Sequence, residues 1–366
     1  LLGDVDVGAM ARAAADLAAA VDALRPIVPP ALVATVRVDV VTPIGRISIR
    51  GTGDDTYPSS DGDALLIVDL GGNDTYRTTV GATASVTNGV SVLVDLSGVD
   101  DYGYDEVAHA RDVGPAGHRR LPSDVDGRLD PSPADTYGPS SRSRTSRQGA
   151  GRLGIGLLYD LGLDGDHYRS LRMSQGDGAL GVGMLFDEGG NDVYEGEAAT
   201  QGAASAGIGL LVDLGGDDER VAYHASQAFA YSRGVGVLYD AAGTDTYFAH
   251  PSDVLYWSPQ NPGGSNSSFC QGVGFGRRDD TGGLYMSGGI GILRDAVGDD
   301  RYTCGIFGQA TGYWYGAGLI LDGAGADHYD GQWYVQGGDA HFAIAALLDG
   351  GGNDVYGETA TRMNAA

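Results

Sequence analysis

Short runs in which small and apolar residues alternate recur along most of the chain. One such run is Gly154-Ile155-Gly156-Leu157-Leu158-Tyr159, which is too short for a helix and rich in glycine. A period of two over this length is typical of a β-strand. The alternation therefore predicts a chain built mostly of short strands.

One segment near the start, residues 5–25, follows a different period. Val7, Met10, Ala14 and Leu17 succeed one another at intervals of three and four residues, which places them on one face of a helix. Prolines from position 26 onward end the helix. We expect this helix to cap an exposed end of the stacked strands. The alternative is a helix that binds a partner or forms a coiled coil.

A turn of the form Asp-x-Gly-Gly-x-Asp, with small variation, follows the alternating runs, and a tyrosine stands two residues after its second aspartate in nine of ten copies. Glycine permits the positive φ that a sharp turn needs. Arg220 replaces the tyrosine in the remaining copy. The second aspartates are Asp55, Asp74, Asp100, Asp166, Asp192, Asp218, Asp245, Asp300, Asp327 and Asp354. The first aspartates, five residues earlier, are Asp69, Asp95, Asp187, Asp213, Asp240, Asp295, Asp322 and Asp349, with Asp160 at this place after one inserted residue.

Uninterrupted copies lie 26 or 27 residues apart, and a fixed period of this size indicates a repeat architecture. We predict an all-β fold, a parallel β-solenoid (β-helix) of about ten coils of 26–27 residues with an N-terminal α-helical cap. Residues 1–45 would form the helix and a lead-in strand, and residues 46–366 the solenoid. Loop insertions are expected at about 103–147, 248–269 and 277–287. A glutamine that recurs after each turn, such as Gln175, is expected to hydrogen-bond along the stack.

Composition narrows the classes of partner. The net charge is −26 and the chain contains no lysine, which argues against nucleic acid as a partner. No apolar run approaches the ~18–20 residues of a membrane-spanning helix. Cys270 and Cys304 are too few for a disulfide scaffold, although one bridge between adjacent coils is open to them. Acidic residues interrupt the first apolar stretch, which argues against a signal peptide. Whether a cleaved leader precedes Leu1 is left open by the sequence.

Stacked coils would place each aspartate above another of its kind. Two unit charges ~4.8 Å apart repel by about 0.9 kcal/mol in water, and by more at lower dielectric. Protonation, hydrogen bonds from turn N–H groups in Asx-turns, or a bound cation would relieve this repulsion. Calcium suits the turn best, because it takes six to eight oxygens in flexible geometry. The candidate metal ligands are Asp69, Asp74, Asp95, Asp100, Asp166, Asp187, Asp192, Asp213, Asp218, Asp240, Asp245, Asp295, Asp300, Asp322, Asp327, Asp349 and Asp354.

The turns Gly71-Gly72-Asn73-Asp74-Thr75-Tyr76, Gly189-Gly190-Asn191-Asp192-Val193-Tyr194 and Gly351-Gly352-Asn353-Asp354-Val355-Tyr356 resemble hemolysin-type (RTX) calcium-binding repeats. The resemblance implies calcium between stacked turns, secretion by a bacterium, ligand roles for the three aspartates, and core or corner positions for the three tyrosines. The chain departs from that family in having one turn per 27 residues and tyrosine at the inward position. It also resembles uncharacterised bacterial proteins built of Gly-Gly-x-Asp-x-Tyr repeats, which implies no activity.

Two insertions combine aromatic residues and arginines. Residues 103–147 hold seven arginines, and Tyr256 and Trp257 lie in the second insertion, with Arg277 shortly after it. We list Tyr256, Trp257 and Arg277 as candidate ligand-binding residues for an anionic glycan. The alternative is that the basic loop folds against the acidic rod.

The uniform repetition favours a non-enzymatic, calcium-stabilised repeat protein that is extracellular, periplasmic or on the cell surface and acts as a scaffold or binding module. The first alternative is a polysaccharide-acting lyase or hydrolase, with Arg277, Arg278, Asp279 and Asp280 as catalytic candidates near the 248–287 loops. The second is a structural subunit of a larger assembly, with coil ends that stack on another protein chain.

Overall fold

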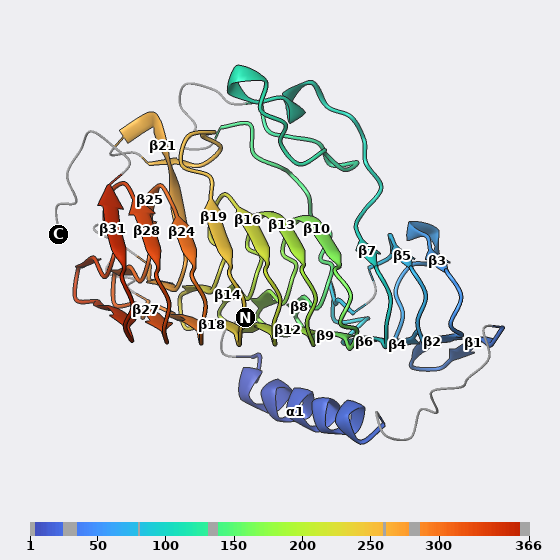
Figure 1. The fold of residues 1–366 in the computed structure, drawn as a ribbon. Helices are drawn as coiled ribbons and strands as arrows, with labels where there is room; N and C mark the ends of the chain where they lie inside the picture. The colour runs from blue at the N-terminus through green and yellow to red at the C-terminus, as the bar shows by residue number, and fades with distance from the viewer. Residues whose placement is uncertain are drawn as a thin grey trace.

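The computed structural model describes residues 4–24, 35–79, 81–130, 138–258, 261–277 and 286–358. These residues are mostly β-strand, arranged in long parallel sheets that do not close into a barrel (Figure 1). The arrangement is consistent with the expected β-solenoid-like fold. No described helix combines the length and the apolar character needed to cross a bilayer.

The first sheet has eleven strands, and the alternating runs of the sequence form most of them. Its strands, in spatial order, are β1 (Arg37–Thr42), β2 (Gly45–Arg50), β4 (Leu66–Val68), β6 (Val90–Asp95), β9 (Ile155–Asp160), β12 (Val182–Asp187), β15 (Ile208–Asp213), β18 (Val235–Asp240), β23 (Ile290–Asp295), β27 (Ala317–Asp322) and β30 (Ile344–Asp349). All neighbours are parallel except β1 and β2, which form an antiparallel hairpin at one edge. The lead-in strand thus belongs to the sheet itself.

The second sheet has ten strands, and each of them begins directly after one of the turns. It contains β3 (Thr56–Tyr57), β5 (Thr75–Tyr76), β7 (Asp101–Tyr102), β10 (His167–Arg172), β13 (Val193–Ala198), β16 (Glu219–Ala222), β19 (Thr246–Ala249), β24 (Arg301–Thr303), β28 (His328–Gly331) and β31 (Val355–Glu358).

The remaining elements are shorter. The third sheet contains β8 (Gly151–Arg152), β11 (Gly178–Ala179), β14 (Ala204–Ser205), β17 (Phe229–Tyr231), β22 (Val273–Phe275), β26 (Gly312–Tyr313) and β29 (Asp339–Ala340). A small sheet joins β20 (Trp257–Ser258), β21 (Asn261–Cys270) and β25 (Ile306–Gly308). Single 3-10 turns lie at Ser59–Asp61, Ala110–Asp112 and Pro115–Gly117.

Successive passes of the chain keep one register, so equivalent residues lie above one another. Leu185 pairs with Leu158 on one side and with Leu211 on the other, and Asp187 pairs with Asp160 and Asp213 in the same way. We use "coil" for one pass through the sheets. Coils without insertions have nearly equal lengths, which maintains this register. A slip of one residue would turn every side chain of a strand to the opposite face of the sheet.

The core is a thin column along the axis, built from two residues of each coil. One is an aliphatic residue of the first sheet, such as Leu211, and the other is the tyrosine of the second sheet, such as Tyr194. Neighbouring tyrosine rings are stacked with centroids 4.6–4.9 Å apart and planes within 1–7°. This separation is the spacing of strands in a sheet, so each ring contacts the tyrosine of the adjacent coil, except where Arg220 stands between Tyr194 and Tyr247.

Glycine is required in the turns by the closeness of the coils. A Cβ atom on Gly216 would lie 1.3 Å from the carbonyl oxygen of Gly190, and Gly216 has φ +144°. Only glycine avoids both the collision and the strain of this conformation. The turns therefore stack at backbone contact.

The recurring glutamines join the coils through the backbone. Gln175 Nε2 donates to the carbonyl of Tyr168 in its own coil (2.9 Å) and to that of Glu195 in the next (3.0 Å). We expected amide groups bonded along the stack, and the bonds instead reach main-chain carbonyls. The buried glutamines thus fasten each corner to its neighbour.

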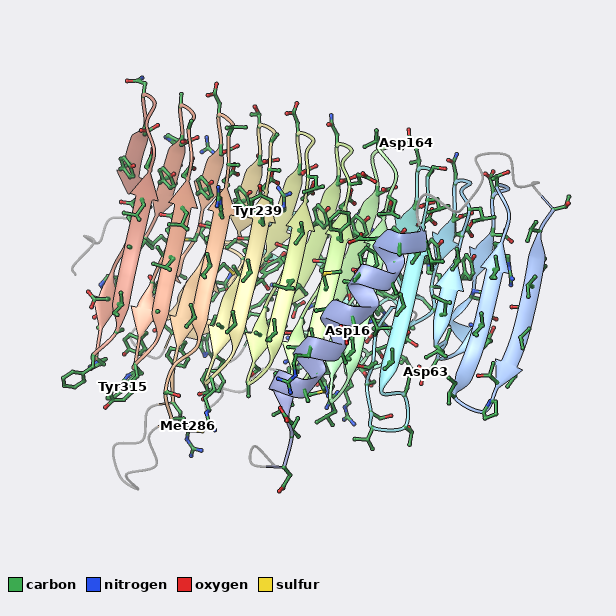
Figure 2. The ribbon with its side chains drawn as sticks, turned by 90° about the horizontal axis from the view of Figure 1, so that it is seen from below. Asp16, Asp63, Asp164, Tyr239, Met286 and Tyr315 are labelled. Atoms are coloured by element: carbon green, nitrogen blue, oxygen red, sulfur yellow. The ribbon has the colours of Figure 1, made fainter. Side chains whose placement is uncertain are left out.

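The helix α1 (Val7–Leu24) lies on the outer face of the first sheet, over β6, β9 and β12, and not on an end of the rod (Figure 2). Its buried residues Ala14 and Val21 pack with Val92, Leu157 and Tyr159. The expectation of an end cap was therefore wrong. These strands are apolar on both faces, and the helix covers the face that does not contribute to the core.

The first two insertions meet on the side of the second sheet (Figure 1). Arg120 pairs with Asp253 at 2.6 Å, and the N–H of Gly138 donates to the carbonyl of Leu255 at 2.7 Å. The first two insertions therefore contact each other directly.

We predict that Val21→Asp detaches α1, because it places a charge between the helix and the sheet. The expected loss is about 2 kcal/mol of unfolding free energy. Chemical denaturation, together with faster hydrogen exchange in α1, measures it. The matched control is Ala20→Asp on the exposed side of the same helix, with a change within about 0.5 kcal/mol. Equal effects of the two substitutions would contradict this placement of the helix.

Candidate metal centre

The first aspartates form a buried column at the ends of the strands of the first sheet. Asp187 lies between Asp160 and Asp213 in the strand register, and all three are inaccessible to solvent. The Oδ1 atom of Asp187 accepts the N–H of Gly189, two residues ahead, at 2.8 Å. Six other first aspartates accept the N–H two residues ahead in the same way. The Asx-turn interpretation of the sequence is therefore right for this oxygen.

The second oxygen of most first aspartates accepts a hydrogen bond from a tyrosine. The hydroxyl of Tyr168 donates to Oδ2 of Asp187 in the next coil at 2.6 Å. Seven tyrosines make this contact from one coil to the next, at 2.5–2.9 Å. Each hydroxyl is a neutral donor, so it orients the carboxylate without cancelling its charge.

The second aspartates form a parallel column inside the turns. The backbone N–H of Asp166 donates to Oδ1 of Asp192 in the next coil at 2.6 Å. The same bond recurs at 2.6–3.1 Å along the whole ladder from Asp55 to Asp354. Each turn is thereby joined to the next by a charge-assisted hydrogen bond.

The other oxygen of the second aspartates points into the space between the two columns. Oδ2 is buried and has no hydrogen-bond partner among the described residues in Asp74, Asp100, Asp166, Asp192, Asp245, Asp300 and Asp327. These side chains are between 1 and 3% exposed. Burying a polar atom without a hydrogen-bond partner costs free energy. A proton or a cation bound to these oxygens would remove that cost.

The two columns combine into clusters that could hold a metal ion. Asp166, Asp187 and Asp192 form one of them, and each contributes an oxygen within 4.8 Å of the others. Equivalent sets are Asp69–Asp74–Asp95 and Asp100–Asp160–Asp166, whereas the sets Asp192–Asp213–Asp218 and Asp218–Asp240–Asp245 include carboxylates that contact Arg220. Donor sets made of carboxylates suit a hard cation that prefers oxygen. The residues therefore supply the kind of donor that a hard cation such as calcium prefers.

Burial makes these carboxylates unfavourable as bare anions. It raises the pKa of Asp74 to about 8, of Asp192 to about 7 and of Asp300 to about 8, and charges on neighbouring aspartates raise these pKa values further. In Asp187 burial is again the main cause, and its pKa lies well above the usual value. At neutral pH the ladder holds either protons or cations.

Arg220 changes this pattern in one coil. Its side chain is fully buried, and its guanidinium lies 5.2 Å from the ring centroids of both Tyr194 and Tyr247, where a tyrosine ring would otherwise stand. Its Nη2 atom lies 2.9 Å from Oδ2 of Asp213 and 2.9 Å from Oδ2 of Asp218. The guanidinium also contacts Asp240 and Asp245.

Most of the metal-ligand candidates thus lie in the two columns, and the last pair, Asp349 and Asp354, is only half-buried. Two positions of the ladder lie outside the set of candidate ligands. Asp160 stands among the first aspartates in the sequence, and its strand aligns with β12 without a gap. Arg220 was noted only as an exception, and the signal was its place in the tyrosine column.

The candidate ligand-binding residues take different places. Tyr256 is buried, its hydroxyl donates to Glu197 at 2.9 Å, and its ring stacks on His224. Trp257 is half-buried in β20, and Arg277 is exposed. The catalytic candidates Arg278, Asp279 and Asp280 lie outside the described residues.

Three arginines of the first insertion form ion pairs with buried or half-buried carboxylates. Arg128 is fully buried and contacts Glu197 of β13 and Asp112 of its own loop. Arg120 pairs with Asp253, and Arg147 with Asp124. These contacts favour the interpretation in which the basic loop folds against the rod. Cys270 and Cys304 are buried and free.

No protein-family model, no curated protein and no solved structure matches this chain.

We predict that the cation-free protein loses stability as the pH rises. The folded pKa values of the ladder aspartates lie above the ordinary value near 3.8, so their contribution is complete below pH 4 and is lost through pH 7–8. One pKa unit corresponds to about 1.4 kcal/mol, so several aspartates together give a large effect. Melting temperatures in chelator between pH 5 and 8.5 test this. A melting temperature that rises toward pH 8 would contradict it.

Proposed function

We propose that this chain is a non-enzymatic, calcium-stabilised repeat protein that serves as a rigid scaffold or binding module. One observation carries the proposal: the same buried cluster of aspartates recurs from coil to coil, and each time one carboxylate oxygen lacks a partner among the described residues. A cation shared between coils would satisfy these oxygens and cancel the repulsion within both columns.

The chemistry of the clusters favours calcium over other common metals. The named clusters consist of aspartates alone, whereas zinc sites use histidine and cysteine. Magnesium retains several waters and demands octahedral geometry, which a buried and crowded site does not supply. Calcium accepts carboxylates in irregular geometry and with variable ligand number. The resemblance of the turns to RTX repeats supports the same ion.

Uniformity favours a scaffold over an enzyme. A catalytic site needs a local departure from the repeat, whereas here the acidic groups, tyrosines and glutamines recur in register. We further propose about ten coils, one for each Asp-x-Gly-Gly-x-Asp turn. Such a rod would present its loops at fixed intervals, and the exposed Arg277 is available to an anionic glycan.

A calcium-dependent fold implies a location outside the cytoplasm. Extracellular calcium modules operate at 10⁻⁴–10⁻³ M, roughly the calcium range outside cells. We therefore propose that the protein is extracellular, periplasmic or on the cell surface, in agreement with the secretion that the RTX resemblance implies.

Calcium added to chelator-treated protein at pH 7.5 is expected to raise the melting temperature by at least ~10 °C. The expected rise reflects several sites, each of which stabilises the folded state by mass action. Differential scanning calorimetry with calcium, magnesium and no metal measures it. An unchanged melting temperature at millimolar calcium would refute the proposal.

Asp192→Asn tests the site itself. The amide keeps the oxygen that accepts the N–H of Asp166 and places an N–H₂ group where the unpartnered Oδ2 lies. We expect fewer calcium ions bound and a higher melting temperature in chelator, because one buried charge is gone. Asp164→Asn is the matched control, since Asp164 lies exposed on the outer edge of a turn (Figure 2). If both variants bind calcium like the parent protein, the cluster is not the site.

A further inference from the structure

The junction between the coil of β15–β16 and that of β18–β19 differs from its neighbours in one residue. Arg220 stands at the tyrosine position of β16, in register with Tyr194 of β13 and Tyr247 of β19. The substitution is isolated, because the tyrosine column continues on both sides with centroid separations of 4.8 Å. The strand register is therefore kept, and the junction lacks the tyrosine that its neighbours have.

The guanidinium lies where the carboxylates converge. It contacts first-column Asp213 and Asp240 and second-column Asp218 and Asp245, which come from two successive coils. All four carboxylates and the guanidinium are inaccessible to solvent or nearly so. An arginine in this position compensates charges that a tyrosine hydroxyl only orients.

Asp218 shows the consequence most clearly. Its Oδ2 atom accepts a hydrogen bond from Arg220 Nη2 at 2.9 Å. The corresponding Oδ2 atoms of Asp166, Asp192 and Asp300 have no partner among the described residues. At this junction a side chain of the protein, Arg220, donates to Oδ2 of the second aspartate. At the other junctions named above, no described residue does so.

We propose that Arg220 is a built-in replacement for the cation of this junction, so that the chain binds calcium on both sides of β16 but not at Asp213–Asp218–Asp240, whose three Oδ2 atoms all accept from Arg220 Nη2. The inference rests on the proposed function, since it assigns one position of the same array. It divides the array into two segments and gives the middle of the rod a junction that needs no calcium.

Arginine is suited to this role by shape as well as by charge. Its planar guanidinium fits between two aromatic rings, as a tyrosine ring does, and it donates in several directions at once. A second arginine, Arg50, stands at the first-aspartate position of the opening copy, 3.7 Å from Asp55 and 5.7 Å from the ring centroid of Tyr57. A guanidinium thus also lies in the opening copy, where the first aspartate is missing.

The test counts bound calcium in three variants by equilibrium dialysis. Arg220→Tyr restores the repeat and is expected to bind one more calcium ion per chain than the parent, with a lower melting temperature in chelator. Arg220→Lys keeps the charge and is expected to leave the count unchanged. Tyr302→Arg introduces the guanidinium between Tyr247 and Tyr329 and is expected to remove one calcium ion.

The outcomes separate the two proposals. A parent protein that binds no calcium refutes the proposed function. A parent protein that binds calcium, with unchanged counts in Arg220→Tyr and Tyr302→Arg, refutes the replacement role alone. If Arg220→Tyr does not fold even with calcium, Tyr302→Arg decides: the loss of one ion supports the inference, and an unchanged count overturns it.

Discussion

The repulsion between like charges at the spacing of stacked strands is the constraint on which this structure depends. Strict register brings aspartates directly above aspartates, in two columns and at the distance of neighbouring β-strands. The same register produces the favourable features of the fold, namely the tyrosine stack, the aliphatic column and the backbone ladder through Oδ1. The protein cannot keep these features and separate the charges. Positive charge must enter the ladder, as protons, as cations or as a side chain.

The hydrogen-bond pattern divides the carboxylate oxygens by role. Three oxygens of each first and second aspartate pair are used in most coils, by the N–H two residues ahead, by a tyrosine hydroxyl and by the N–H of the preceding turn. The fourth oxygen lacks a partner among the described residues, and it faces the other column. This division explains why the turn needs two aspartates and a tyrosine at fixed spacing. The first three bonds position the carboxylates, and the fourth oxygen is left without a hydrogen bond from the protein.

The repeat made much of this predictable from the sequence, since equal spacing implies equal register, and register implies the columns. Other features depend on contacts that spacing does not encode. The apolar face of α1 would pack against any apolar surface, so its place on β9 and β12 was not predictable. Aromatic composition did not show that Tyr256 is buried against Glu197. The sequence places Asp160 among the first aspartates, but spacing alone did not show that the residue inserted after it leaves the strand register with β12 intact.

The most direct measurement is the metal content of the purified protein by inductively coupled plasma mass spectrometry. The protein is prepared with calcium and then dialysed against buffer that contains neither calcium nor chelator. The account predicts that more than one calcium ion per folded chain is retained and is lost together with thermal stability when chelator is added. A folded chain that retains no calcium, and whose stability at neutral pH does not respond to chelator, would show that the ladder is neutralised by protons alone and would contradict the central claim.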